Sequence, residues 1–146
     1  YQTYIDGGVV VNNPSIPALL QALYQPENPA DSRRQHVPAL NEIALLSVGT
    51  GRFEKWVPGR DQRWGFLRWA GLFPEISINT QTGMTSFQSE MLLGARYQRL
   101  NADLKGYIPL DAVDKVPYLA SVPRRDPAVR ALLNQTRAWL LKYYGG

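Results

Sequence analysis

The stretch EIALLSVGTG, residues 42–51, sets the fold class of this chain. It is a short apolar run that ends in glycines. Such a run is typical of a strand that is buried on both faces, as in a parallel sheet. We therefore expect residues 42–51 to form a buried strand of a parallel sheet.

The residues before this run predict a strand and a helix. The sequence YQTYI, residues 1–5, combines aromatic and β-branched side chains and ends at Asp-Gly-Gly, which is typical of a strand. Residues 15–25 predict a helix, with Ser15 as its N-cap and Pro17 in its first turn. A strand, a helix and a buried strand form a βαβ unit, so the predicted class is α/β.

The residues after the run predict further elements of both kinds. Residues 75–95, which are rich in Ser and Thr, predict a helix. The sequence ARYQRLNADL, residues 95–104, predicts another strand. Residues 102–125 have a mixed pattern that predicts no single element.

The C-terminal helix has the clearest signal in the chain. Asp126 is a candidate N-cap, Pro127 suits the first helical position, and two glycines follow at residues 145–146. Apolar and small residues repeat along it at three-four spacing: Val129, Leu132, Leu133, Thr136, Leu140 and Tyr143.

Length and composition limit the fold and the chemistry. The chain has 146 residues, of which 45% are hydrophobic and 19% charged, which fits one globular domain or part of one. The formal net charge of +4 allows an acidic partner or an anionic membrane surface without requiring either. The sequence has no cysteine and one histidine, His36, so no metal site is predicted. The chain opens within a predicted strand, so we expect further residues upstream of Tyr1.

The acid Asp6 closes the first predicted strand and is followed by Gly7 and Gly8. In an open α/β sheet, ligands bind beyond the carboxyl ends of the strands, so an acid at this place is a candidate catalytic group. Asp-Gly is also a common turn dipeptide, and an ordinary turn is the alternative.

The wider pattern resembles the patatin-like phospholipase family. DGGVVVNNP, residues 6–14, is similar to the family's acid motif, and SVGTG, residues 47–51, is similar to the strand end that follows it. YQRLN, residues 97–101, and PLDAVD, residues 109–114, resemble the stretches that come next in such chains. The resemblance covers residues 1–146 as the C-terminal half of a single patatin-like domain, which implies a three-layer α/β/α sandwich with a mostly parallel sheet.

This resemblance implies a lipid acyl hydrolase that uses a Ser–Asp dyad and no cofactor. Asp6 would take the proton of the serine, while Gly7 and Gly8 let the chain turn tightly, and Asn12 and Pro14 shape the turn that follows. The expected substrates are phospholipids, lysophospholipids or neutral acyl esters, at a cytoplasmic or membrane-peripheral location. The family's nucleophile lies in a G-x-S-x-G elbow, which does not occur in these residues. We therefore expect this chain alone to be inactive and an upstream segment to supply the serine.

Residues 51–73 mix aromatic and basic side chains. Such a mixture suits a membrane interface, where rings lie at headgroup depth and cations meet anionic lipid. It also suits single-stranded nucleic acid, which ranks well behind, so no nucleic-acid partner is predicted. A third explanation is a loop and short helix whose rings pack in the core. The candidate lipid contacts are Trp56, Arg60, Arg63, Trp64, Arg68 and Trp69.

Several alternatives stay open. A non-catalytic lipid-binding or protein-interaction module on the same scaffold is the main competing function, and the sequence does not give the oligomeric state. Residues 49–54 lack the third glycine of a dinucleotide fingerprint, so Ser47 and Thr50 are interpreted as local hydrogen-bonding groups. The remaining acids, which match no metal motif, are expected in solvated turns: Asp103, Asp111 and Asp114.

Overall fold

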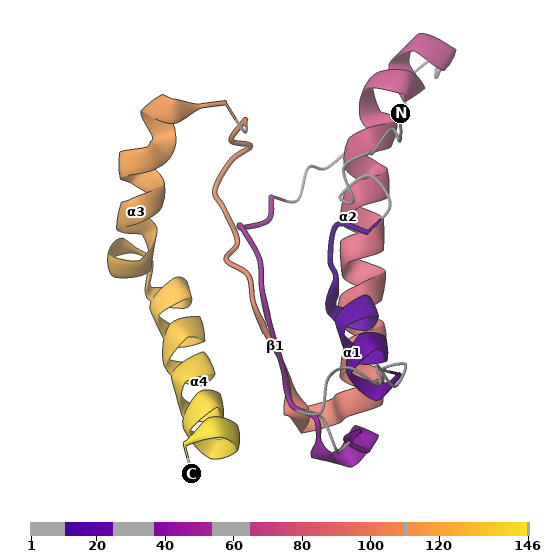
Figure 1. Cartoon of the computed structure of the whole chain (residues 1–146). Helices are drawn as coiled ribbons and strands as arrows, with labels where there is room; N and C mark the ends of the chain where they lie inside the picture. Colours follow the sequence, from indigo (N-terminus) through magenta and orange to yellow (C-terminus); the bar gives the residue numbers. More distant parts are fainter. Residues whose placement is uncertain (1–10, 25–36, 54–64, 110, 146) are drawn as a thin grey trace, which may run out of the picture. The chain divides into compact units, whose positions relative to one another are not determined.

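The computed structural model describes residues 11–24, 37–53, 65–109 and 111–145, and not the side chains of residues 66–69, 71, 72, 74 and 75 (Figure 1). These residues form a mixed α/β structure of helices and a two-stranded parallel sheet, which confirms the predicted class. The predicted strand over residues 1–5 lies outside the described residues, and the three-layer sandwich stays a prediction. The chain divides into two compact units: Tyr1–Leu45 with Arg60–Tyr97, and Leu46–Gly59 with Gln98–Gly146.

The first unit is built on two helices that pack side by side, α1 (Ser15–Leu23) and α2 (Phe66–Leu93) (Figure 1). Leu19 of α1 and Leu93 of α2 are almost fully buried. A short 3-10 helix, η2 (Leu40–Glu42), precedes the sheet, and a second one, η3 (Gly94–Arg96), follows α2. The Arg96 guanidinium links the two, because it donates to the carbonyls of Leu40 and Ile43 at 3.4 and 3.2 Å.

The helix α2 has an unusual distribution of polar and apolar side chains. Its fully buried Ser89 donates to the Thr85 carbonyl at 2.8 Å, so part of its buried face is hydroxylated. At 100° per residue, five of its exposed apolar side chains lie within one arc of about 80°, whereas the exposed Ile78 and Leu92 lie outside this arc. This apolar stripe, whose members are 38% to 72% exposed, consists of Phe73, Ile76, Met84, Phe87 and Met91.

Two helix starts differ from the sequence prediction. The helix expected over residues 75–95 begins earlier, at Phe66, so residues 66–73 of the aromatic and basic stretch are helical. The N-cap of α1 is Pro14, not Ser15, and Ser15 is the first helical residue. The prediction of Ser15 as the N-cap was wrong because the side-chain amide oxygen of Asn13 accepts from both the N–H and the hydroxyl of Ser15, at 3.2 and 2.6 Å.

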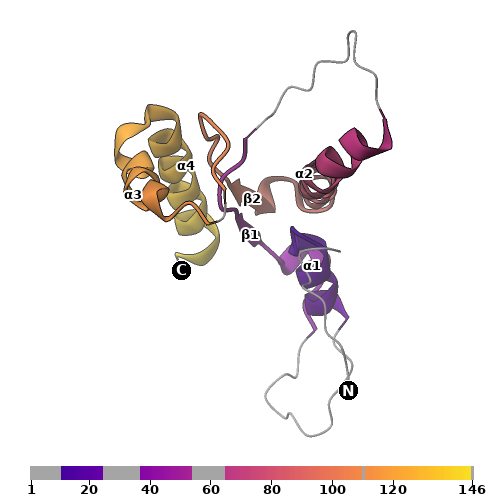
Figure 2. The same cartoon turned by 90° about the horizontal axis from the view of Figure 1, so that it is seen from above.

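The sheet consists of β1 (Leu45–Val48) and β2 (Tyr97–Leu100), which run in parallel (Figure 2). The strand expected within residues 95–104 is thus confirmed, and the run 42–51 forms a shorter strand than expected. The prediction that this run is buried on both faces was wrong: only Ser47 of β1 is buried, and Val48 is 65% exposed. In the described part of the chain β1 pairs with β2 alone. No second strand there covers the other edge of β1, which leaves its side chains more exposed.

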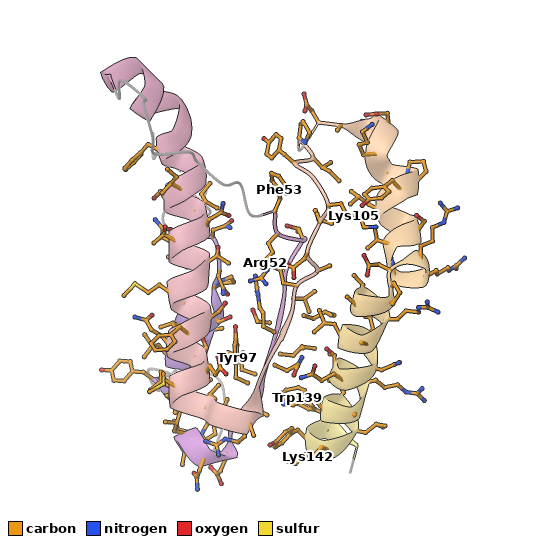
Figure 3. All side chains as sticks on the ribbon, turned by 180° about the vertical axis from the view of Figure 1, so that it is seen from behind. Arg52, Phe53, Tyr97, Lys105, Trp139 and Lys142 are labelled. Atoms are coloured by element: carbon orange, nitrogen blue, oxygen red, sulfur yellow. The ribbon has the colours of Figure 1, made fainter. Side chains whose placement is uncertain are left out.

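The second unit adds two helices to the sheet, α3 (Val116–Arg125), preceded by the 3-10 turn η4 (Val113–Lys115), and α4 (Pro127–Tyr144). The helices α3 and α4 pack on each other and bury Val122 and Val129. The sequence did not predict α3, because two prolines and several charges hide its pattern. Trp139 of α4 is also buried and lies on the face turned toward the paired strands (Figure 3).

The predicted stripe of α4 is partly correct. Val129 and Thr136 are buried as expected, whereas Leu133 and Leu140 are exposed. Trp139, which the predicted spacing left out, takes the buried position near the end of the helix, and its ring lies 5.1 Å from that of Tyr143 at a tilt of 48°. None of the helices in the described residues has the length and hydrophobicity that crossing a bilayer requires.

The N-cap of α4 gives a test of this unit. Asp126 accepts a hydrogen bond from the Ala128 N–H at 2.9 Å, as the sequence predicted. Asp126→Ala should lower the free energy of unfolding by about 0.5–2 kcal/mol, because it leaves that N–H without its cap. Urea denaturation measures the change, and Asp126→Asn, which keeps an acceptor, should stay close to the wild type. An alanine variant as stable as wild type would contradict this assignment.

Candidate functional site

Several predicted site residues fall outside the described residues. They include the acid Asp6 with Gly7 and Gly8, the loop residue His36, and four of the six candidate lipid contacts, Trp56, Arg60, Arg63 and Trp64. The other two, Arg68 and Trp69, lie in the first turns of α2, where the backbone alone is described. Their proposed roles stay predictions.

The end of the acid motif is described, and it is attached to α2. Asn12 donates from its amide nitrogen to the Thr82 hydroxyl at 3.2 Å. Pro14 starts α1, and its carbonyl accepts from the Ala18 N–H at 2.9 Å. The chain at these two residues therefore leads into α1 and is hydrogen-bonded to α2. Their role in shaping a turn stays a prediction.

Asn13, between them, is the residue that sequence reasoning missed. Only 2% of it is exposed. Its amide nitrogen donates to the Ser86 hydroxyl at 3.1 Å and to the Thr82 carbonyl at 3.5 Å, while its amide oxygen holds Ser15. We call this set of contacts among Asn13, Ser15, Thr82 and Ser86 the Asn13 clamp. The Asn-Asn pair directly before the proline that caps α1 was the available signal.

The SVGTG turn and the YQRLN strand, which the sequence presented as separate pieces, contact each other directly. The Gly49 N–H donates to the Leu100 carbonyl at 2.8 Å. The Gly51 N–H donates to the Asn101 side-chain oxygen, also at 2.8 Å. A Cβ at Gly49 would collide with the Asn101 side chain and lie 2.8 Å from Nη2 of Arg99, so any larger residue would have to displace these side chains.

Two arginines tie the same ends together. Arg99 donates to the buried Ser47 hydroxyl at 2.6 Å, which agrees with the interpretation of Ser47 as a local hydrogen-bonding group. Beyond the strands, Arg52 pairs with Asp103 through two bonds, from Nε to Oδ1 and from Nη2 to Oδ2 at 3.3 Å (Arg52 is labelled in Figure 3). The hydrogen bond from Arg52 lowers the pKa of Asp103 below its usual value, so this carboxylate is ionised at neutral pH.

The chemistry available at these described side chains is limited. The acids Asp103, Asp111 and Asp114 are exposed as expected, and Asp114 pairs with Lys115 at 2.8 Å. That contact lowers the pKa of Asp114 and raises the pKa of Lys115. Among the residues that the structure describes, no cluster of His, Cys, Asp or Glu could hold a metal ion.

Comparisons with protein-family models, curated proteins and solved structures gave no match to this chain.

The glycine at the end of the turn provides a test. Gly51 has a φ of 102°, and a Cβ there would lie 2.8 Å from Cδ1 of Leu104. Gly51→Ala should therefore cost about 1–3 kcal/mol of unfolding free energy, measured by urea denaturation.

The matched control is Gly83→Ala in α2, where an added Cβ meets nothing within 4 Å. It should raise stability by about 0.5–1 kcal/mol, because alanine favours the helix. Equal effects of the two substitutions would contradict the geometry of the turn.

Proposed function

We propose that this chain supplies the acid half of a patatin-like lipid acyl hydrolase. In this proposal Asp6 is the acid of a Ser–Asp dyad whose serine lies in a segment upstream of Tyr1. The whole protein would form a three-layer α/β/α domain in which Asp6 follows the first strand. The expected substrates are phospholipids, lysophospholipids or neutral acyl esters.

The main support for the proposal is a contact between two of the motifs that make up the resemblance. SVGTG and YQRLN belong to the resemblance only by their order in the sequence, yet Gly51 and Asn101 from these two stretches are hydrogen-bonded at 2.8 Å. The parallel pairing of β1 and β2 is also the arrangement that an open α/β sheet requires. The SVGTG and YQRLN motifs are therefore parts of one local structure. A chance resemblance would not require these two motifs to be in contact.

The proposed reaction follows from the dyad. The serine hydroxyl attacks the ester carbonyl while Asp6 accepts its proton, and the alcohol leaves with a proton returned by Asp6. Water then attacks the acyl-serine, and the fatty acid is released. The pKa of a free Asp is about 3.9, which makes it a weak base. Either burial and nearby groups raise the pKa of Asp6, or Asp6 acts mainly by orienting the hydroxyl. No metal ion or organic cofactor takes part in these steps.

Substitution of Asp6 tests the enzyme directly. In the full-length protein, Asp6→Asn should reduce kcat for hydrolysis of a soluble short-chain ester by roughly 10²–10⁴-fold, because the amide cannot accept the proton. A chromogenic ester assay measures the rate, and circular dichroism checks that the fold persists.

The control is Asp111→Asn, at an exposed carboxylate that the proposal leaves out of the chemistry, and it should keep its activity. A folded Asp6→Asn protein with near-native turnover would overturn the enzyme proposal.

A second candidate, a lipid-binding module without catalysis, is favoured by the apolar stripe of α2. Large exposed apolar patches often mark sites that bind lipids or partners. Three of its side chains, Met84, Phe87 and Met91, are each more than 60% exposed. The aromatic and basic stretch, residues 51–73, runs into the start of the stripe at Phe73, and its composition suits an anionic lipid surface.

Removing the stripe tests this second candidate. The variant Met84→Gln, Phe87→Gln and Met91→Gln in the full-length protein should bind vesicles of phosphatidylcholine and phosphatidylglycerol about tenfold or more weakly, because each side chain loses part of its transfer free energy. Co-sedimentation measures binding. The control changes three leucines of α4 that are partly or largely exposed, Leu133, Leu140 and Leu141, to Gln. Equal binding by both variants, or none by wild type, would reject the candidate.

A further inference from the structure

The positive charge of the chain is concentrated in its C-terminal helices. Residues 115–146 contain six lysines and arginines and one acid, Asp126, so their formal charge is +5, against +4 for all 146 residues. The carboxylate of Asp126 already accepts from the Ala128 N–H as the N-cap of α4. Figure 3 shows nitrogen-tipped side chains along the side of α3 and α4 that faces away from the paired strands. The outer side of these two helices is therefore a cationic surface.

Two arginines and a tyrosine of α4 lie in one line along the helix. Arg130, Arg137 and Tyr144 recur at intervals of seven residues, which places them within about 40° of one another and each about 10 Å along the axis from the next. Both arginines are exposed, and 59% of Tyr144 is exposed. The arginines lie about 80° or more around the helix from the buried Val129 and Trp139. We call these three residues the α4 row.

The stability of α4 does not account for the two arginines of the row. Arg130 lies in the first turn of the helix, where the macrodipole is unfavourable for a cation. Residues 133, 134, 140 and 141, which flank Arg137 at helical spacing, include no acid. Neither arginine forms an ion pair with a carboxylate in the described part of the chain. Their guanidinium groups are therefore available to anions from outside that part.

The chemistry of the α4 row fits phosphate groups at a lipid surface. A guanidinium can donate two parallel hydrogen bonds to one phosphate, whereas a lysine ammonium acts as a point charge. A tyrosine ring suits the headgroup depth of a bilayer, because its body is apolar and its hydroxyl is polar. A nucleic acid also offers phosphates, but it binds single-stranded through rings on which successive bases stack, and the row has one ring.

We propose that the α4 row binds the phosphate headgroups of anionic phospholipids. The choice of a lipid as partner rests on the proposed function, whose substrate is a lipid or another acyl ester. Arg124 and Arg125, which are exposed at the end of α3, add to the attraction at longer range. The row attracts lipid by charge, whereas the apolar stripe of α2 would bind by transfer of apolar side chains. Salt therefore distinguishes the two surfaces, because it screens only the first kind of attraction.

The test compares vesicle binding by variants of the full-length protein. The double variant Arg130→Gln and Arg137→Gln should bind vesicles of equal parts phosphatidylcholine and phosphatidylglycerol about 10- to 30-fold more weakly, because each arginine near an anionic surface adds to the attraction. Glutamine favours a helix about as well as arginine does, so circular dichroism should show an unchanged fold. Co-sedimentation measures binding, and wild-type binding should fall as the salt concentration rises.

The matched control removes the same charge elsewhere in the second unit. Lys105→Gln and Lys115→Gln change two exposed lysines outside the row and should leave binding within about twofold of wild type, because charges beyond a Debye length from the lipid are screened. Equal weakening by both double variants would mean that total charge alone matters, and it would overturn the inference. Wild-type binding to phosphatidylcholine vesicles as tight as to the anionic vesicles would overturn it as well.

A nucleic acid is the competing polyanion. Polyuridylate tests it in the same buffer, and wild-type protein should bind it more weakly than the anionic vesicles. Binding of polyuridylate at least as tight as that of the vesicles would overturn the choice of a lipid.

These outcomes are distinct from those of the hydrolase test. If wild type hydrolyses the soluble ester but binds no anionic vesicle, the enzyme proposal stands and the inference about the row fails. If the vesicles bind through the row and no ester is hydrolysed, the enzyme proposal fails and the row stands as a lipid-binding surface.

Discussion

Two short strands that lie far apart in the sequence pair in parallel, and the structure between and beyond them depends on this constraint. A parallel pair cannot be closed by a tight turn, so the chain between β1 and β2 must cross over, and it includes the long helix α2. At the carboxyl ends, the bond between Gly51 and Asn101 extends the contact past the last ladder residues. The Arg52–Asp103 pair continues it as an isolated parallel bridge. Each strand has four residues, so the ladder between them is short. The contacts beyond the ladder therefore fix the strand ends more firmly than the ladder would alone.

The fold could be predicted from the sequence where a local signal decides the structure. Asp126 caps α4, and Tyr97–Leu100 forms a strand, because side-chain chemistry within a few residues determines both. The start of α2 was missed, since aromatic and basic residues carry no helical stop or start signal. Burial of β1 on both faces was wrong because burial depends on neighbouring strands, which no local pattern specifies. The short helix α3 was not predicted because residues 102–125 have a mixed pattern, although Pro117 lies at its N-terminus, where proline is tolerated.

The contacts of the described motif residues could not be predicted from the sequence. Asn12 and Pro14 were named through the resemblance of residues 6–14 to a family motif, yet Asn13 carries the buried bonds. Its partners lie some seventy residues away on α2, and a single sequence does not report such a pairing. The same holds for Arg99, which reaches Ser47 across the sheet. The sequence shows the order of the motifs. The hydrogen bonds that join them form only in the folded chain.

The crowding around the glycines of the SVGTG turn has an evolutionary consequence. Gly49 faces the side chains of Arg99 and Asn101, and Gly51 has a positive φ beside Leu104, so neither accepts a side chain without a shift of its neighbours. Selection for stability alone would keep both glycines unchanged among descendants of this chain. Their invariance would then carry no information about phosphate binding or catalysis. A change at Asn101 that appeared together with a larger residue at position 49 would instead mark a lineage in which the turn had been rebuilt.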